Sequence, residues 1–219
     1  MTTRLSFQEA MGALRADIAW LGGMSEDAVR SAGDALLSGD RARAEVVVSG
    51  DDELDMLFLQ LEERAYELIA RHAPVAVDLR FLVSSLRVMS DFERTGDGAV
   101  SLAKIAMLDW EREPVSVELL TTIAAGAVRI VGDARRAWRE QDVELAARLE
   151  IDDDALDDAY HRLTAHLLIQ HGPDASGLVL HALLAGRHLE RIADHAVAVG
   201  DRVLYMMTGD PASLAAEIS

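Results

Sequence analysis

The sequence Glu93-Arg94-Thr95-Gly96-Asp97 returns later in the chain as Glu190-Arg191-Ile192-Ala193-Asp194. In each copy, two carboxylates stand four residues apart within a run whose apolar residues recur every three or four positions. On a helix these carboxylates project from one face, and Leu82, Met89 and Val100 predict that this face points into the core. A carboxylate taken out of water needs a cation, an arginine or a water-filled groove, because an unpaired one costs several kcal/mol. The function of the chain depends on which of these it has.

The composition limits both the fold and the chemistry. The chain has 219 residues, half of them hydrophobic, with only 4 prolines and no cysteine. These values predict an all-α protein with a sizeable core and exclude disulfides, thiolate zinc sites and iron–sulfur clusters. The net charge of −17, with 21 scattered Lys and Arg residues, argues against nucleic acid as a partner. We expect a cytoplasmic location, because residues 1–17 do not resemble a signal peptide and no apolar run approaches the ~20 residues of a membrane span.

Six helices are expected from the spacing of apolar residues and from the stop signals between them. The glycine and aspartate of Ser38-Gly39-Asp40 separate the first two helices, and Pro74 suits the first turn of the third. The expected ranges are 5–36, 40–71, 74–109, 115–139, 142–170 and 173–208, followed by a loose tail.

The second half of the chain repeats the first. Asp40 and Asp55 return 102 positions later, at Asp142 and Asp157, whereas Glu93 returns 97 positions later. We therefore predict a tandem repeat of two three-helix bundles, packed end to end or side by side with pseudo-twofold symmetry. The expected domains are residues 1–110 and 111–210, with a C-terminal tail at 211–219.

The repeat is expected to place four carboxylates at one level in each unit. Counted from the turn near Pro74, two acids of the second helix lie about 18 and 22 residues before it, and two of the third lie about 19 and 23 after it. The second hairpin gives the same match, and all-oxygen clusters suit Mg²⁺, Mn²⁺ or iron, with zinc a weaker match. The predicted metal ligands are Asp51, Asp55, Glu93 and Asp97 in the first unit and Asp153, Asp157, Glu190 and Asp194 in the second.

Two other interpretations stay open. The first is a metal-independent helical scaffold, because acidic pairs often face water or are neutralised by nearby arginines. The second is a carboxylate-bundle metalloenzyme of the ferritin-like di-iron type, but no glutamate is followed by histidine three positions later, as such sites require. We therefore expect no catalytic residues. The arginines close to the acids are Arg80, Arg87, Arg94, Arg187 and Arg191.

Histidines accompany the acids of the second unit. They are extra nitrogen ligands or a pH-sensitive interface in one interpretation, and exposed or singly hydrogen-bonded side chains in the simpler one. His181, His188 and His195 share one helix face at heptad spacing, and His161, His166 and His171 lie upstream.

Three stretches, taken in order, resemble the PhoU family of regulators of bacterial phosphate uptake. They are Ala73–Arg80 (APVAVDLR), Glu93–Asp97 (ERTGD) and Glu190–Val197 (ERIADHAV), although Thr95 stands where the family usually has isoleucine. The resemblance covers nearly the whole chain, and it implies two three-helix bundles, metal binding by the paired acids and a homodimer. It also implies repression of phosphate-starvation signalling when phosphate is plentiful, through the ATPase component of the phosphate ABC transporter and the sensor histidine kinase. Such a protein reaches the membrane only through its partners.

Overall fold

The structure is a computed structural model that describes residues 2–171 and 175–218 as six long α-helices and one 3₁₀ segment. The helices are α1 Thr2–Ser38, α2 Arg41–His72, α3 Ala76–Ala106, α4 Pro114–Glu140, α5 Val143–Leu167 and α6 Ala175–Thr208. The 3₁₀ segment, η1, spans Pro211–Ile218. The prediction of an all-α protein with six helices is confirmed.

Equivalent aspartates begin the middle helix of each repeat. Asp40 accepts a hydrogen bond from the backbone N–H of Arg43 at 3.0 Å, and Asp142 accepts one from Leu145 at 3.0 Å. Each bond satisfies an N–H group that has no partner within its own helix. The repeat is therefore visible in the capping of α2 and α5 as well as in the acidic motifs.

Several helix boundaries differ from the prediction by two or three residues. Pro74 does not lie in the first turn of α3, because Ala73 has a left-handed backbone (φ 43°) and Val75 an extended one, and the helix begins only at Ala76. The chain reverses its direction at these residues, between α2 and α3. The third helix ends at Ala106, before the expected residue 109. Similarly, α5 ends at Leu167, since Ile169 and Gln170 form tighter turns with bonds to carbonyl groups three residues back. The predicted start of the sixth helix at residue 173 lies outside the described residues.

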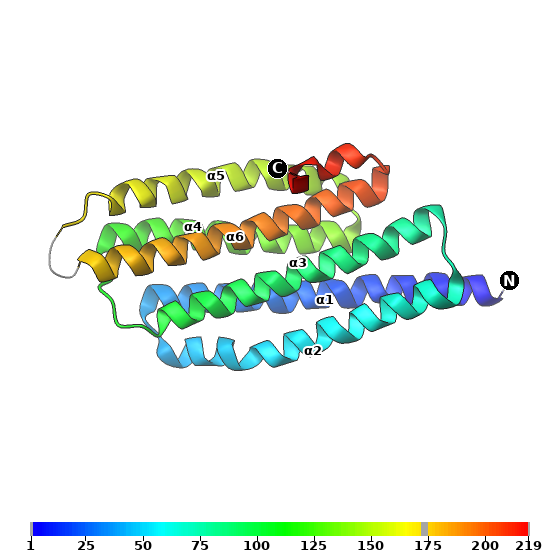
Figure 1. The fold of residues 1–219 in the computed structure, drawn as a ribbon, viewed down its shortest axis with the longest axis horizontal. Coiled ribbons are helices and arrows are strands. Elements are labelled where there is room, and N and C mark those ends of the chain that lie inside the picture. Colours follow the sequence, from blue (N-terminus) through cyan, green and yellow to red (C-terminus); the bar gives the residue numbers. More distant parts are fainter. Residues whose placement is uncertain (1, 172–174, 219) are drawn as a thin grey trace.

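The helices form two three-helix units that lie side by side along one long axis (Figure 1). Helix α2 packs on α1 and α3, and α5 packs on α4 and α6. The units join where α3 meets α6 and where α1 meets α4, so these four helices form the centre, with α2 and α5 outside. Of the two arrangements that the sequence left open, the side-by-side one is observed. The domain boundary expected after residue 110 falls between α3 and α4 and stays a prediction.

Trp138 connects the two units within the core. Its ring is fully buried on α4 and stacks on Phe81 of α3, with ring centroids 5.8 Å apart. Its indole N–H donates to the backbone carbonyl of Arg15 on α1 at 3.1 Å, so this polar group has a partner despite its burial. One side chain thus links three of the four central helices.

An 18-residue stretch of helix α4 has a mean hydropathy of 1.5, so the helix is long and apolar enough to cross a membrane by length and composition alone. The expectation that no apolar run approaches the length of a membrane span did not take account of this segment. However, α4 packs against α1, α5 and α6 and buries Ile123, Ile130 and Trp138 among them. Its apolar character is accounted for by its place as a core helix of the bundle.

Candidate cation sites

The first acidic cluster lies between α2 and α3 and consists of Asp51, Asp55, Glu93 and Asp97. Burial, followed by the charges of Asp55 and Asp97, raises the pKa of Asp51, and burial followed by Asp97 raises the pKa of Asp55. Burial, the charge of Asp97 and a hydrogen bond between the two side chains raise the pKa of Glu93. These causes place the acids of α2 and α3 within electrostatic reach of one another, at the same part of the hairpin.

Gly96 allows α2 and α3 to approach at the level of this cluster. A Cβ atom at this position would lie 2.8 Å from Leu54 Cδ1, which is closer than real side chains pack. Gly96 directly precedes Asp97, and Leu54 directly precedes Asp55. The contact between the glycine and the leucine therefore sets the separation of the two acid pairs.

The second acidic cluster lies between α5 and α6 and consists of Asp153, Asp157, Glu190 and Asp194. Burial, followed by the charges of Asp157 and Asp194, raises the pKa of Asp153 to about 7. Burial and then Glu190 raise the pKa of Asp157, and the same two causes raise the pKa of Asp194. Each ionised acid makes ionisation of the others less favourable, as is expected of like charges in one site.

Two oxygen atoms of the second cluster are buried without a partner. Oδ1 of Asp153 and Oδ1 of Asp157 are shielded from solvent, and neither accepts a hydrogen bond from the residues that the structure describes. The guanidinium group of Arg187 is occupied by an ion pair with Glu190. A buried carboxylate oxygen needs a donor or a cation, so this donor set fits a metal ion.

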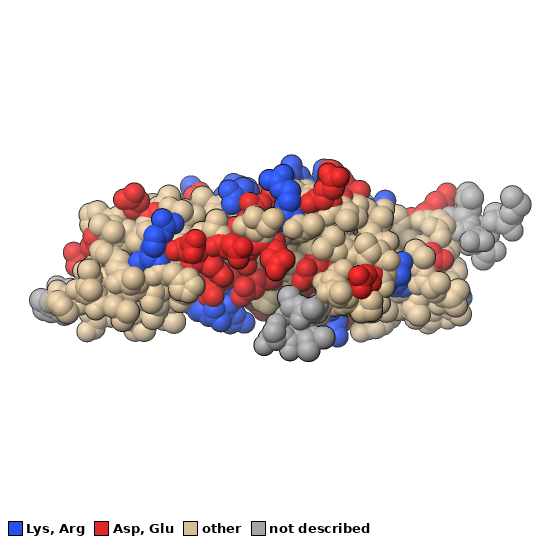
Figure 2. Space-filling view, turned by 90° about the horizontal axis from the view of Figure 1, so that it is seen from above, with Lys and Arg blue, Asp and Glu red and all other residues tan. Residues whose placement is uncertain are grey.

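A cavity of about 600 Å³ lies beside the second cluster, between α5, α6 and η1. Besides Asp153 and Asp194, it is lined by Glu150, Asp154 and Asp201. Figure 2, viewed from the α5 side of Figure 1, shows acidic side chains gathered along the middle of this face. The predicted ligands do not include these three additional acids, although their spacing of three, four or seven residues from the predicted ligands is a helical signal.

The clusters are not assembled as finished metal sites. Within residues 2–171 and 175–218, no three Asp, Glu or His side chains already form a metal-binding group. Asp97 and Asp194 are exposed at the edge of the helix contacts, so the prediction that they lie on the buried face is wrong. Repulsion disfavours a tight gathering of ionised carboxylates that lack a counter-ion. Metal ligation by the eight acids stays a prediction.

The predicted neutralising arginines take different roles. Among the described residues, Arg187 alone of the five forms an ion pair with a cluster acid, and Arg80 instead donates to the carbonyl of Met206 at 3.0 Å. Arg94 and Arg191 line a separate cavity of about 260 Å³ between α3 and α6. His188 and His195 also line this cavity, beside the arginines and one predicted ligand, Asp97.

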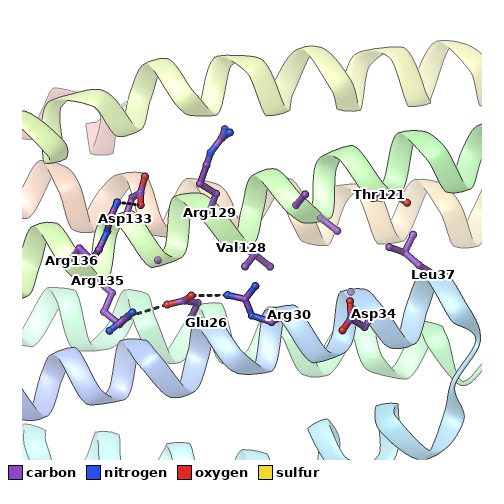
Figure 3. A pocket seen from close by; sticks show the side chains of 14 residues that line it. Glu26, Arg30, Asp34, Leu37, Thr121, Val128, Arg129, Asp133, Arg135 and Arg136 are labelled. Atoms are coloured by element: carbon purple, nitrogen blue, oxygen red, sulfur yellow. Dashed lines mark hydrogen bonds and ion pairs between the residues drawn. The ribbon is translucent and has the colours of Figure 1, made fainter.

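A third hollow, of about 470 Å³, runs between α1 and α4 (Figure 3). Three of its arginines are held by carboxylates within the same groove, and Arg129 lies 4.0 Å from Asp152 of α5. Glu26 accepts from Arg30 at 2.8 Å and from Arg135 at 3.0 Å, and Asp133 pairs with Arg136 at 2.5 Å. Because these positive charges are already neutralised, the groove is a poor site for an anion.

Comparison with known proteins gives two matches to the PhoU domain, at residues 18–106 and 120–203, one in each repeat. The chain is 31% identical over 212 residues to the phosphate-specific transport system accessory protein PhoU homolog of Caulobacter vibrioides, covering 94% of this chain and 91% of that protein. It is 32% identical over 209 residues to PhoU homolog 2 of Mycobacterium tuberculosis, covering 94% of this chain and 98% of that protein.

Solved structures agree with this match. PhoU from Pseudomonas aeruginosa has a TM-score of 0.88 and 28% identity, covering 93% of this chain and 100% of that chain. The phosphate transport system regulatory protein PhoU from Streptococcus pneumoniae, with a TM-score of 0.85 and 24% identity, shows the same fold. The relatives from Caulobacter vibrioides and Mycobacterium tuberculosis are named as accessory proteins and not as enzymes, in agreement with the prediction of no catalytic residues. The chain therefore belongs to the PhoU family.

Proposed function

We propose that this protein is a metal-binding regulator that represses phosphate uptake and phosphate-starvation signalling when phosphate is plentiful. It acts in the cytoplasm, as a homodimer, on the ATPase component of the phosphate ABC transporter and on the phosphate sensor histidine kinase. It reaches the membrane only through these partners. The names of its relatives, which are accessory proteins of phosphate-specific transport, support the role in transport.

The observation that carries the metal-binding part is the pair of orphaned oxygen atoms on Asp153 and Asp157. These residues, with Glu190 and Asp194, would hold one ion or more, and the first cluster would do the same on α2 and α3. Mg²⁺, Mn²⁺ or iron suits an all-oxygen set better than Zn²⁺ does. A bound ion would supply the positive charge that the acids lack.

The charges of the acids determine how tightly the two helices of each hairpin pack when a cation binds or is removed. Without neutralisation, repulsion between Asp153 and Asp194 weakens the contact of α5 with α6, and repulsion between Asp51 and Asp97 weakens that of α2 with α3. Once the acids are neutralised, both contacts tighten. The outer helices α2 and α5 are then held in one position for recognition by a partner.

The test uses a bacterial strain that lacks its own PhoU protein and carries a reporter gene driven by a phosphate-starvation promoter. Wild type, the Asp153→Asn, Asp157→Asn variant and the Asp51→Asn, Asp55→Asn variant are compared at high phosphate. A matched control, Glu45→Gln, Glu63→Gln, removes the same charge from exposed positions of α2. We expect wild type and the control to repress the reporter, and both cluster variants to leave it active.

The two parts of the proposal fail separately. A wild-type protein that does not repress the reporter would reject the regulatory role. Full repression by both cluster variants would reject the metal-binding part and favour a metal-independent helical scaffold. The scaffold alternative has one observation behind it, namely that no metal-binding group of three side chains is already formed among the described residues. It predicts that chelator changes neither repression nor stability.

A further inference from the structure

The cavity between α3 and α6 collects positive charge from both repeats. Arg94 of the first repeat and Arg191 of the second line it, together with His188 and His195. Each arginine is the second residue of a Glu-Arg-x-x-Asp motif, so the two occupy equivalent positions in the two repeats. The side-by-side packing of the repeats thus brings two equivalent guanidinium groups to one hollow of about 260 Å³.

Close packing of α3 on α6 forms one wall of this cavity. A Cβ atom at Gly98 would lie 2.7 Å from Ile192 Cγ1, so the backbone of α3 approaches α6 at this point more closely than a side chain would permit. Gly98 and Ile192 both line the cavity. The contact holds the helices that carry Arg94 and Arg191 at a fixed separation.

The arginines of this cavity differ from those of the α1–α4 groove, where Glu26 and Asp133 form ion pairs. Neither Arg94 nor Arg191 forms an ion pair or a hydrogen bond with any residue that the structure describes. Burial and then the charges of both arginines lower the pKa of His195 to about 4. The cavity therefore presents two guanidinium groups whose hydrogen-bonding capacity is not used by the described residues, although the chain has a net charge of −17.

The carboxylate of Asp97 limits which anion fits, because it lines the cavity beside the two arginines. Asp91 does not line the cavity, but its Oδ1 lies 3.7 Å from Nδ1 of His195, which does. An ionised carboxylate accepts hydrogen bonds and cannot donate them. A fully deprotonated anion is therefore repelled on this side, whereas an anion that keeps a proton can donate it to a carboxylate oxygen.

We propose that this cavity binds one small tetrahedral oxyanion that retains a proton, such as inorganic phosphate, between Arg94 and Arg191. The planar fork of a guanidinium group matches the oxygen atoms of such an anion. The cavity is smaller than the ~300–1,000 Å³ typical of sites for drug-sized ligands, which favours a small ion. Because α3 and α6 belong to different repeats, the anion clamps the two repeats together.

This anion site goes beyond the proposed function, because it does not require a metal ion. The two sites are nevertheless linked through Asp97, which belongs to the first acidic cluster and also lines the cavity. A cation that neutralises Asp97 at the first acidic cluster reduces the repulsion between Asp97 and an anion in the cavity. Cations at the first cluster are therefore expected to strengthen phosphate binding, and phosphate to strengthen cation binding by the same factor.

The test is calorimetric titration of the full chain with inorganic phosphate, in a phosphate-free chloride buffer with chelator. We expect one phosphate per chain for wild type and an affinity at least about tenfold lower for Arg94→Gln, Arg191→Gln. The control, Arg30→Gln, Arg136→Gln, removes the same charge from the ion-paired α1–α4 groove and should keep the wild-type affinity. Circular dichroism checks that each variant remains folded.

Three results would overturn the inference: no binding by wild type at millimolar phosphate, equal binding by the Arg94 and Arg191 variant, or an equal loss in the control. Sulfate keeps no proton at neutral pH and should therefore bind about tenfold more weakly than phosphate. Equal affinities for sulfate and phosphate would overturn the requirement for a proton. In the same titration, a nucleoside triphosphate should release no binding heat that is lost in the Arg94→Gln, Arg191→Gln variant. If the triphosphate gives such heat and inorganic phosphate gives none, the choice of a small ion is overturned. Metal content measured on chelator-free preparations of the same proteins separates this failure from a failure of the cation sites.

Discussion

Asp157 stands one helical turn after Asp153 on α5, and each carries one buried carboxylate oxygen that accepts no hydrogen bond within the described part of the chain. Because these two oxygens lie on one helix face, the second cluster carries more negative charge than its neighbouring cations neutralise. An ionised carboxylate in this position destabilises the fold unless a cation neutralises it. Stability should therefore respond to cations and to these residues together.

The substitution Asp153→Asn is expected to stabilise the metal-free protein. At pH 8 the Asp153 carboxyl, whose pKa burial and neighbouring acids raise to about 7, is ionised and repelled by Asp157 and Asp194. Removing the charge should increase the free energy of unfolding by on the order of 1–3 kcal/mol in chelator. Added Mn²⁺ should raise the melting temperature of wild type and have a much smaller effect on the variant.

Thermal unfolding in chelator and in Mn²⁺ checks both signs of the Asp153→Asn prediction. The control is Glu63→Gln, an exposed change on α2 that should stay within ~0.5 kcal/mol of wild type in both conditions. A loss of stability for Asp153→Asn in chelator would contradict the view that this carboxylate lacks a partner in the folded protein.

Gly98→Ala is expected to destabilise the protein by about 1–3 kcal/mol, because the new methyl group would overlap Ile192 Cγ1 at 2.7 Å and push α3 away from α6. Gly50→Ala is the matched control, since nothing lies within 4 Å of a Cβ atom at this helical position. There the change should stabilise by about 0.5–1 kcal/mol. Urea unfolding measures both, and effects of the same sign would contradict the close approach of α3 and α6.

Glu113 begins α4 and also reaches α5. Its carboxylate accepts hydrogen bonds from the backbone N–H groups of Val115 at 3.0 Å and Ser116 at 2.8 Å, and it lies 3.0 Å from Nε2 of His166. Burial alone would raise its pKa, but the hydrogen bonds outweigh burial and lower the pKa from 4.5 to about 2. The ionised form is therefore favoured by folding.

A lowered pKa determines the sign of the pH dependence. The stabilisation from Glu113 is complete above pH 4.5 and is lost as the pH falls toward 2. Glu113→Gln should therefore cost about 1 kcal/mol at pH 6 and less at pH 3.5, as measured by urea unfolding. Glu111→Gln, an exposed change in the same turn, should have little effect at either pH. A cost that grows on acidification would show that the carboxylate is not held in its ionised form.

Most of the fold could be predicted because local patterns carry it. Asp40 and Asp142 mark equivalent helix starts, and both cap as their residue type predicts. The start of α3 was misplaced at Pro74, since the proline rule describes a local preference and the reversal of the chain between α2 and α3 uses the same residues. Whether the repeats lie side by side or end to end depends on contacts between distant segments. The periodicity of apolar residues along one helix does not predict such contacts.

The sequence predicted which helices carry the acids of the candidate sites, but it did not predict the partners of individual atoms. Counting residues from the turn predicted that Asp51 and Asp97 share one level, and the effect of the Asp97 charge on the pKa of Asp51 agrees with this. The sequence could not reveal that Oδ1 of Asp153 lacks a partner, because that depends on how α5, α6 and η1 pack. It also suggested that Arg94 and Arg191 neutralise acids, whereas the contact of α3 with α6 directs them to a shared cavity.

The measurement to make first is the metal content of the protein, purified without chelator and equilibrated with Mg²⁺, Mn²⁺ and iron. Wild type and the control Glu45→Gln, Glu63→Gln should contain stoichiometric metal. The Asp153→Asn, Asp157→Asn variant and the Asp51→Asn, Asp55→Asn variant should each lose the share bound by their own cluster. Absence of metal from the wild type, or equal metal in wild type and both cluster variants, would contradict cation binding by the paired acids.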